Sequence, residues 1–148
     1  AGLKLGVYHF GYARHGGELE VERNFLLSFL KDCGLMPKHL PLGVFWDVEE
    51  DSYRGREFPR PGVINRMCHA FCEGTAAAGY RAGIYASASW LQSYIKAAEF
   101  AGHTLWAAQW WKECTVKEAG IWQFTDHLEV AGHIFDGNRI LEKTDGDE

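Results

Sequence analysis

The stretch GVFWDVEED, residues 43–51, decides the fold class and holds the first functional clue. It begins as an unbroken apolar run, which is typical of a strand buried on both faces of a parallel sheet. It ends in acids, with Asp47 and Glu49 separated by one valine. Because successive strand side chains point to opposite faces, these two acids are expected on one face, with Cα atoms about 6.6 Å apart.

Strands and helices alternate on both sides of this stretch. We expect further strands over 3–10, 81–87, 104–111, 119–125 and near 133–138, and helices over 18–34, 62–80 and 88–102. The order β-α-β-α-β-α-β-β-β predicts an α/β protein with a parallel sheet covered by helices. Six strands are too few to close an eight-stranded barrel, so we expect an incomplete TIM-like (β/α) barrel.

The acid pair is placed at the carboxyl end of its strand, which is the catalytic end in barrels. Two neighbouring carboxyl groups repel each other and partial burial raises a carboxyl pKa, so one of them is expected to hold a proton near neutral pH. A proton donor beside an anion is what glycoside hydrolysis requires. The pattern is weak by itself. The alternative is a strand end that meets solvent, followed by the charged loop residues Glu50 and Asp51.

Composition narrows the class of protein. The 148 residues suit one domain, expected over 1–141, and an apolar content of 47% is enough for a core. The net charge of −5 argues against nucleic acid as a partner. No apolar run of about 18 residues occurs, so no membrane span is expected, and the first residues lack a signal-peptide pattern. The acidic stretch 142–148 is interpreted as a tail or linker.

Cysteine, histidine and serine patterns indicate no metal, cofactor or nucleophile. The four cysteines match no disulfide framework and no CxxC pair. Cys68 and Cys72, with His69 beside them, would need more ligands for a metal site, so they are interpreted as reduced helix residues. Ser87 and Ser89 lack the G-x-S-x-G pattern, and one of them is expected to cap the helix that follows.

Six segments in one order carry a resemblance to a known family. They are GVYHFGYA (6–13), FWDVE (45–49), GIYASASWL (83–91), LWAAQW (105–110), IWQFTD (121–126) and FDGN (135–138). Together they resemble the lysozymes of glycoside hydrolase family 25, the muramidases of bacteria, phages and some fungi. The resemblance runs from Gly6 to about Ile140 and corresponds to strands 3 to 8 of that family's barrel.

The resemblance implies roles for single residues. Glu49 corresponds to the general acid. Asp47 is implied to position or stabilise the substrate's N-acetyl group or the attacking water. Asp136 of FDGN is implied to line the site, and Tyr8 and Tyr85 to border the cleft.

Two tryptophans are further candidates for sugar contact, because the apolar faces of sugar rings stack on aromatic planes. Trp110 and Trp122 both lie toward strand ends. Gln123 must point opposite to Trp122, so at most one of these two residues faces the site.

Similar proteins cleave the β-1,4 bond between N-acetylmuramic acid and N-acetylglucosamine in bacterial peptidoglycan, without a metal or organic cofactor. The resemblance therefore implies action at the cell wall, by a secreted protein or one released during phage lysis.

Family members begin with an earlier strand, whose Asp is another active-site carboxylate, so we expect the first two strands to be missing here. The alternative function is then a peptidoglycan-binding module or an inactive fragment. The two unpaired strand edges would favour dimers.

Overall fold

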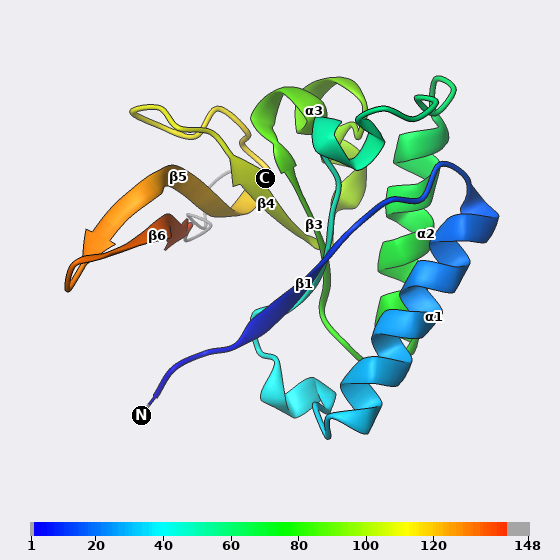
Figure 1. Ribbon diagram of the computed structural model, residues 1–148, viewed down its shortest axis with the longest axis horizontal. Coiled ribbons are helices and arrows are strands. Elements are labelled where there is room, and N and C mark those ends of the chain that lie inside the picture. The colour runs from blue at the N-terminus through cyan, green and yellow to red at the C-terminus, as the bar shows by residue number, and fades with distance from the viewer. Residues whose placement is uncertain (1, 142–148) are drawn as a thin grey trace.

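The computed structural model describes residues 2–141, so the predicted acidic tail over 142–148 lies outside the described residues. Six strands form one sheet in the order β1-β2-β3-β4-β5-β6. Figure 1 shows this sheet curling over, with helices α1 and α2 side by side against one of its faces. The strands are β1 (Gly6–Phe10), β2 (Gly43–Asp47), β3 (Ala82–Ser87), β4 (Thr104–Ala108), β5 (Ala119–Val130) and β6 (His133–Ile140).

The helices lie in the connections between the parallel strands. They are α1 (Gly16–Asp32), α2 (Val63–Ala77) and α3 (Ala88–Ser93), with short 3-10 turns η1 (Pro37–His39), η2 (Glu50–Tyr53) and η3 (Ala97–Phe100). The first four strands pair in parallel, as expected for strands joined by helical crossovers. β5 also pairs in parallel with β4, although the connection between these two strands contains no helix. This curled half-barrel confirms the prediction of an α/β, incomplete TIM-like fold.

The last strand pair differs from the predicted parallel sheet, because β5 and β6 are antiparallel. β5 also runs to Val130, five residues past the predicted end at Thr125. The turn between them has two residues, Ala131 and Gly132, with φ of 51° and 79°. Positive φ at both positions is the geometry of a type I′ hairpin, whose twist suits antiparallel strands. The sequence Ala-Gly is a weak signal for this turn, so the hairpin was not predicted.

The third predicted helix, over 88–102, is shorter in the structure. α3 ends at Ser93, after which the backbone N–H groups of Tyr94 and Ile95 both bond to the Trp90 carbonyl. Lys96 then adopts a left-handed conformation with φ of 56°, and η3 follows. The break turns the chain so that Ile95 is fully buried. Ser87 accepts a hydrogen bond from the Trp90 backbone N–H, which confirms the predicted capping role of this serine.

The main core lies between the sheet and the helices. It is built from alternate strand residues, such as Val44, Trp46 and Val48, and from the buried sides of α1 and α2. The Trp46 ring packs on Phe71 of α2, and its indole N–H donates to Glu22 of α1 at 3.2 Å. The residues between these core positions therefore point to the concave face of the sheet.

Both outer strands have one free edge within residues 2–141, since β1 pairs there only with β2 and β6 only with β5. The proposed dimerisation through these edges stays a prediction. None of the helices in this part of the chain is long and apolar enough to cross a membrane.

Candidate active site at the carboxyl ends of the strands

The concave face of the sheet carries the predicted acid Asp47. In the strand register Asp47 lies between Phe10 of β1 and Tyr85 of β3. Phe45 lies two residues earlier on the same face, with its ring 5.4 Å from that of Trp106 on β4. Asp47 is only 5% exposed, so its carboxyl group is buried at the point where β2 ends.

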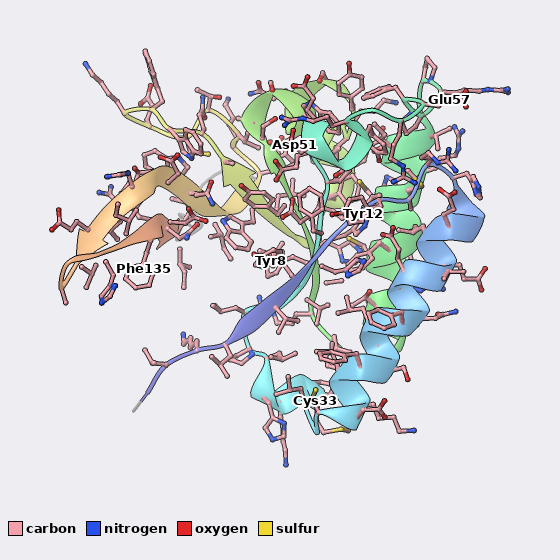
Figure 2. The ribbon with its side chains drawn as sticks, in the orientation of Figure 1. Tyr8, Tyr12, Cys33, Asp51, Glu57 and Phe135 are labelled. Atoms are coloured by element: carbon pink, nitrogen blue, oxygen red, sulfur yellow. The ribbon has the colours of Figure 1, made fainter. Side chains whose placement is uncertain are left out.

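Glu49 lies just beyond β2 and opens the turn η2. Its backbone is fixed by Ser52, whose hydroxyl accepts from the Glu49 N–H at 3.1 Å and whose own N–H donates to the Glu49 carbonyl at 3.0 Å. Ser52 is buried, so this small turn is anchored in the molecule. Figure 2 shows the neighbouring Asp51 at one end of the molecule, far from Cys33 at the other end. The acids therefore lie at the end toward which the parallel strands run.

The pKa of Asp47 is strongly perturbed by its surroundings. Burial, followed by the charge of Glu49 and a hydrogen bond with it, raises the pKa of Asp47 to about 8. One Asp47 oxygen, Oδ1, has no hydrogen-bond partner in the described residues. Asp47 therefore holds a proton at neutral pH, because a buried carboxyl group next to a second acid ionises only at a high cost in free energy.

Tyr85 lies in the same electrostatic environment. Burial raises the pKa of its hydroxyl, and the negative charges of Asp47 and Glu49 raise it further. The hydroxyl donates to Gln123 on β5 at 3.1 Å. Tyr85 thus stays a neutral phenol beside the acid pair.

Gln123 connects three sides of the site. Its side-chain oxygen accepts from the Tyr85 hydroxyl and from the Trp110 indole N–H, each at 3.1 Å. Its nitrogen donates to Asp136 of β6 at 3.2 Å. Gln123 itself is 4% exposed, so the amide is a buried link between residues that lie far apart in the sequence.

A hollow opens above this network. It has a volume of about 330 Å³ and is lined by Glu49, Tyr85, Ser87, Ala108 and Trp110. Trp110 follows the end of β4 and is 59% exposed, so one ring face is open to a ligand. An acid, a phenol and an exposed indole around one hollow suit a sugar, which needs both polar contacts and an apolar platform.

The structure brings most of the predicted site residues together. Glu49, Tyr85 and Trp110 line the hollow, and Asp47 and Asp136 adjoin it through Glu49 and Gln123.

Tyr8 shares the concave face but does not line the hollow, and it is exposed. It is on β1, with its ring edge-on to Trp106 at 6.3 Å. Figure 2 shows Tyr8 on the side of the sheet turned away from α1 and α2.

Trp122 is the one predicted residue that the structure separates from the others. It pairs with Ala107 of β4, whose side chain belongs to the helix-side core, and its indole N–H donates to the Gln109 carbonyl at 2.7 Å. The guanidinium of Arg139 covers its ring. Trp122 thus lies on the helix side of β5, and the next residue, Gln123, joins the network on the concave face. The sugar contact at Trp122 stays a prediction.

Sequence reasoning missed two residues of this face. Gln123 was the alternative to Trp122, and alternation alone could not decide between the two. Trp106 contacts Tyr8, Phe45 and Tyr85, and its indole N–H donates to Asn138 at 2.8 Å. Its place on one face with Trp110 in the pattern WAAQWW was the available signal.

No group of three or more His, Cys, Asp or Glu residues within 2–141 could hold a metal ion. Cys68 and Cys72 are buried in α2, and burial raises the pKa of both thiols. The polar groups described at the site are instead the carboxyl, phenol, amide and indole groups of Asp47, Glu49, Tyr85, Gln123 and Trp110.

Comparison with known proteins defines the class. The model of "Glycosyl hydrolases family 25" matches residues 1–133. Since this match covers most of the 148 residues, the chain belongs to glycosyl hydrolase family 25. A comparison with curated protein sequences gives no significant match.

Solved structures show the same fold at low sequence identity. The modular autolysin LytC of Streptococcus pneumoniae superposes with a TM-score of 0.72 at 21% identity, over 88% of this chain and 32% of that one. A family 25 glycosyl hydrolase of Bacillus anthracis gives 0.70 at 16% identity, over 98% of this chain and 67% of that one. The CTP1L endolysin gives 0.66 at 22% identity, over 95% and 48%. The chain thus spans between about a third and two thirds of the length of these proteins.

Proposed function

We propose that this chain is the catalytic part of a peptidoglycan hydrolase, a lysozyme of the N-acetylmuramidase type that works at the bacterial cell wall. The observation that carries the proposal is the pair of acids at the end of β2, in which Asp47 is buried and Glu49 lines a sugar-sized hollow beside Tyr85 and Trp110. Membership of glycosyl hydrolase family 25 supports the reaction class. The structural neighbours include LytC with a synthetic peptidoglycan ligand and the Cpl-1 endolysin with a peptidoglycan analogue.

The proposed reaction cleaves the β-1,4 bond between N-acetylmuramic acid and N-acetylglucosamine. Glu49 borders the hollow and donates its proton to the glycosidic oxygen as the bond breaks. This proton comes from Asp47, whose raised pKa keeps it protonated near neutral pH, and it passes to Glu49 through the hydrogen bond between the two carboxyl groups. Water then adds to the sugar carbon and returns a proton to the acid pair. No metal or organic cofactor takes part.

Two other groups act on the charge that develops on the sugar. Asp136, oriented by the Gln123 amide, stabilises the positive charge on the sugar or its acetamido group. Trp110 provides a platform for a sugar ring beside Glu49. Tyr8 and Tyr85 border the same concave face, so the glycan is proposed to run along the carboxyl ends of β1 to β4.

The test of the proposal is the variant Glu49→Gln, which keeps the size of the side chain but removes its proton. Release of reducing sugars from a cell-wall suspension is expected to fall by at least about 100-fold. Glu50→Gln is the matched control, since Glu50 is the exposed neighbour and should leave the rate unchanged. Equal activity of Glu49→Gln and the unmodified chain would remove Glu49 from the mechanism.

A second candidate is a module that binds peptidoglycan without cutting it. The observation that favours it is the exposed ring of Trp110 beside the hollow, which suits holding a sugar whether or not it is cut. Co-sedimentation with insoluble cell wall, measured beside reducing-sugar release, separates the two functions. Binding without any release of sugar from the unmodified chain would support the module.

A further inference from the structure

We propose that Gln123 is a positioning residue of this site, whose single buried amide sets Trp110, Tyr85 and Asp136 in the arrangement that receives a glycan. The inference rests on the proposed function and adds to it a residue outside the acid pair. Its basis is geometric, since three hydrogen bonds of 3.1, 3.1 and 3.2 Å converge on one side chain that is 4% exposed.

The chemistry of the partners determines which way the amide points. An indole N–H can only donate, so the atom of Gln123 that faces Trp110 must be the oxygen. The nitrogen then faces Asp136, whose carboxylate can accept from it. A side chain with the same shape but without both a donor and an acceptor cannot make this set of bonds.

The bond to Trp110 fixes an otherwise exposed ring. Trp110 lies beyond the end of β4, and the bond to Gln123 is its only side-chain hydrogen bond within residues 2–141. A ring that is already oriented loses less freedom when a sugar stacks on it, so the fixed plane strengthens binding. Gln123 therefore acts on the glycan through Trp110 without touching it.

The bond from Tyr85 determines which ligand groups fit. The single hydroxyl hydrogen of Tyr85 is used by Gln123, so its oxygen can only accept a hydrogen bond from the hollow. This part of the hollow therefore selects a donor, which is a sugar hydroxyl or an acetamido N–H. Loss of Gln123 frees the hydrogen and removes this selection.

A double-mutant cycle tests the action through Trp110. Binding of a soluble peptidoglycan tetrasaccharide is measured by calorimetry for the unmodified chain, Gln123→Leu, Trp110→Phe and the double variant. Gln123→Leu is expected to weaken the Kd about tenfold. In the Trp110→Phe background, which keeps a ring but lacks the N–H, the same change should weaken it less than about threefold. Contacting residues show such non-additive effects.

The variant Gln123→Glu gives a second readout that a purely structural role would not produce. Its carboxyl group can still accept from Tyr85 and Trp110, but it can donate to Asp136 only when protonated. Tetrasaccharide binding is therefore expected near the unmodified level at acid pH, with a loss as the new carboxyl ionises beside Asp136. The titratable groups that face this position are Tyr85 on β3, Asp136 on β6, and Asp47 and Glu49 at the end of β2.

The pH series needs two controls. The unmodified chain in the same buffers corrects for the titration of the acid pair, and Gln92→Glu introduces the same charge at an exposed position on α3. Thermal melts establish that each variant is folded. If Gln123→Leu does not fold, the pH series of Gln123→Glu decides alone.

The outcomes separate this inference from the proposed function. A tenfold loss that shrinks without the Trp110 N–H, or a pH-dependent rescue of Gln123→Glu, supports the positioning role. Equal losses in both backgrounds, no loss in Gln123→Leu, or a flat pH series would overturn it while leaving the glycan site in place. Absence of tetrasaccharide binding by the unmodified chain would overturn both.

Discussion

The two faces of the sheet carry different kinds of side chain, an apolar set toward the helices and a mixed polar and aromatic set on the concave face. On the face toward the helices, the β2 residues Val44 and Trp46 are fully buried among apolar neighbours. On the concave face, Phe45 and Asp47 alternate with them and meet aromatic and polar groups from the neighbouring strands. The same five-residue strand therefore supplies the core with one set of side chains and the site with the other.

Burial has opposite effects on the free energy of folding at the two faces. The helix-side residues gain free energy by leaving water, which is the main stabilising contribution to folding. Burial of Asp47 on the concave face destabilises the folded protein, because its Oδ1 atom has no hydrogen-bond partner within the described residues and its pKa is raised to about 8. The concave face thus gives up stability in exchange for a perturbed acid, as functional sites commonly do.

The largest expected difference between the faces concerns two tryptophans. Trp46→Ala should lower the free energy of unfolding by about 3–5 kcal/mol, because the indole is fully buried and its bond to Glu22 is lost. Trp106→Ala, on the half-exposed concave face, should cost about 1–2 kcal/mol. Urea denaturation measures both values. Equal losses would show that the concave face contributes to stability as much as the core does.

A smaller difference concerns the pH dependence of Asp47. Its folded-state pKa is raised to about 8, so between about pH 4 and pH 8 the unfolded chain has released a proton that the folded chain keeps. Stability therefore falls as pH rises through this window. Asp47→Asn removes the ionisation, so it should gain about 1–3 kcal/mol relative to the unmodified chain between pH 4 and pH 8.

Urea denaturation at several pH values measures this gain. Asp32→Asn, at an exposed position near the end of α1, is the control and is expected to show no comparable trend. A stability difference for Asp47→Asn that stays constant with pH would mean that Asp47 ionises normally in the folded protein.

The smallest effect is expected at the exposed rim of the concave face. Trp110→Ala should weaken tetrasaccharide binding about tenfold, equivalent to about 1.4 kcal/mol, because the sugar platform is lost. The melting temperature should change little, since Trp110 is 59% exposed. Trp111→Ala is the matched control, because this adjacent tryptophan is 69% exposed and does not line the hollow. Equal effects of the two changes would argue against a specific platform.

The fold was predictable wherever a local pattern was strong. The run Gly43–Asp47 is a strand because it is apolar throughout, and Ser87 caps a helix because its hydroxyl accepts a backbone N–H. The antiparallel hairpin depends on positive φ at Ala131, which alanine rarely adopts. The end of α3 depends on Lys96, which is likewise left-handed, and neither residue type signals such a backbone.

The acid pair was predictable for a similar reason, but the part of Gln123 in the site was not. Asp47 and Glu49 are two residues apart, so alternation along a strand was enough to place them on one face. The choice between Trp122 and Gln123 depends on which of them points to the concave face of the sheet, and the register of β5 against β4 and β6 decides this. Asp136 joins the site through Gln123, thirteen residues away in sequence.

The amino-acid sequence by itself determined the order of strands and helices and the position of the acids, because these depend on periodicity and on neighbours within a few residues. The family followed from the resemblance of six ordered segments to known lysozymes. Only the tertiary structure decided that β5 and β6 form a hairpin, that Gln123 rather than Trp122 contacts Tyr85, Trp110 and Asp136, and that Asp47 is buried. Each of these depends on groups from distant strands that meet at one end of a curled sheet, where register and burial are set by the whole fold.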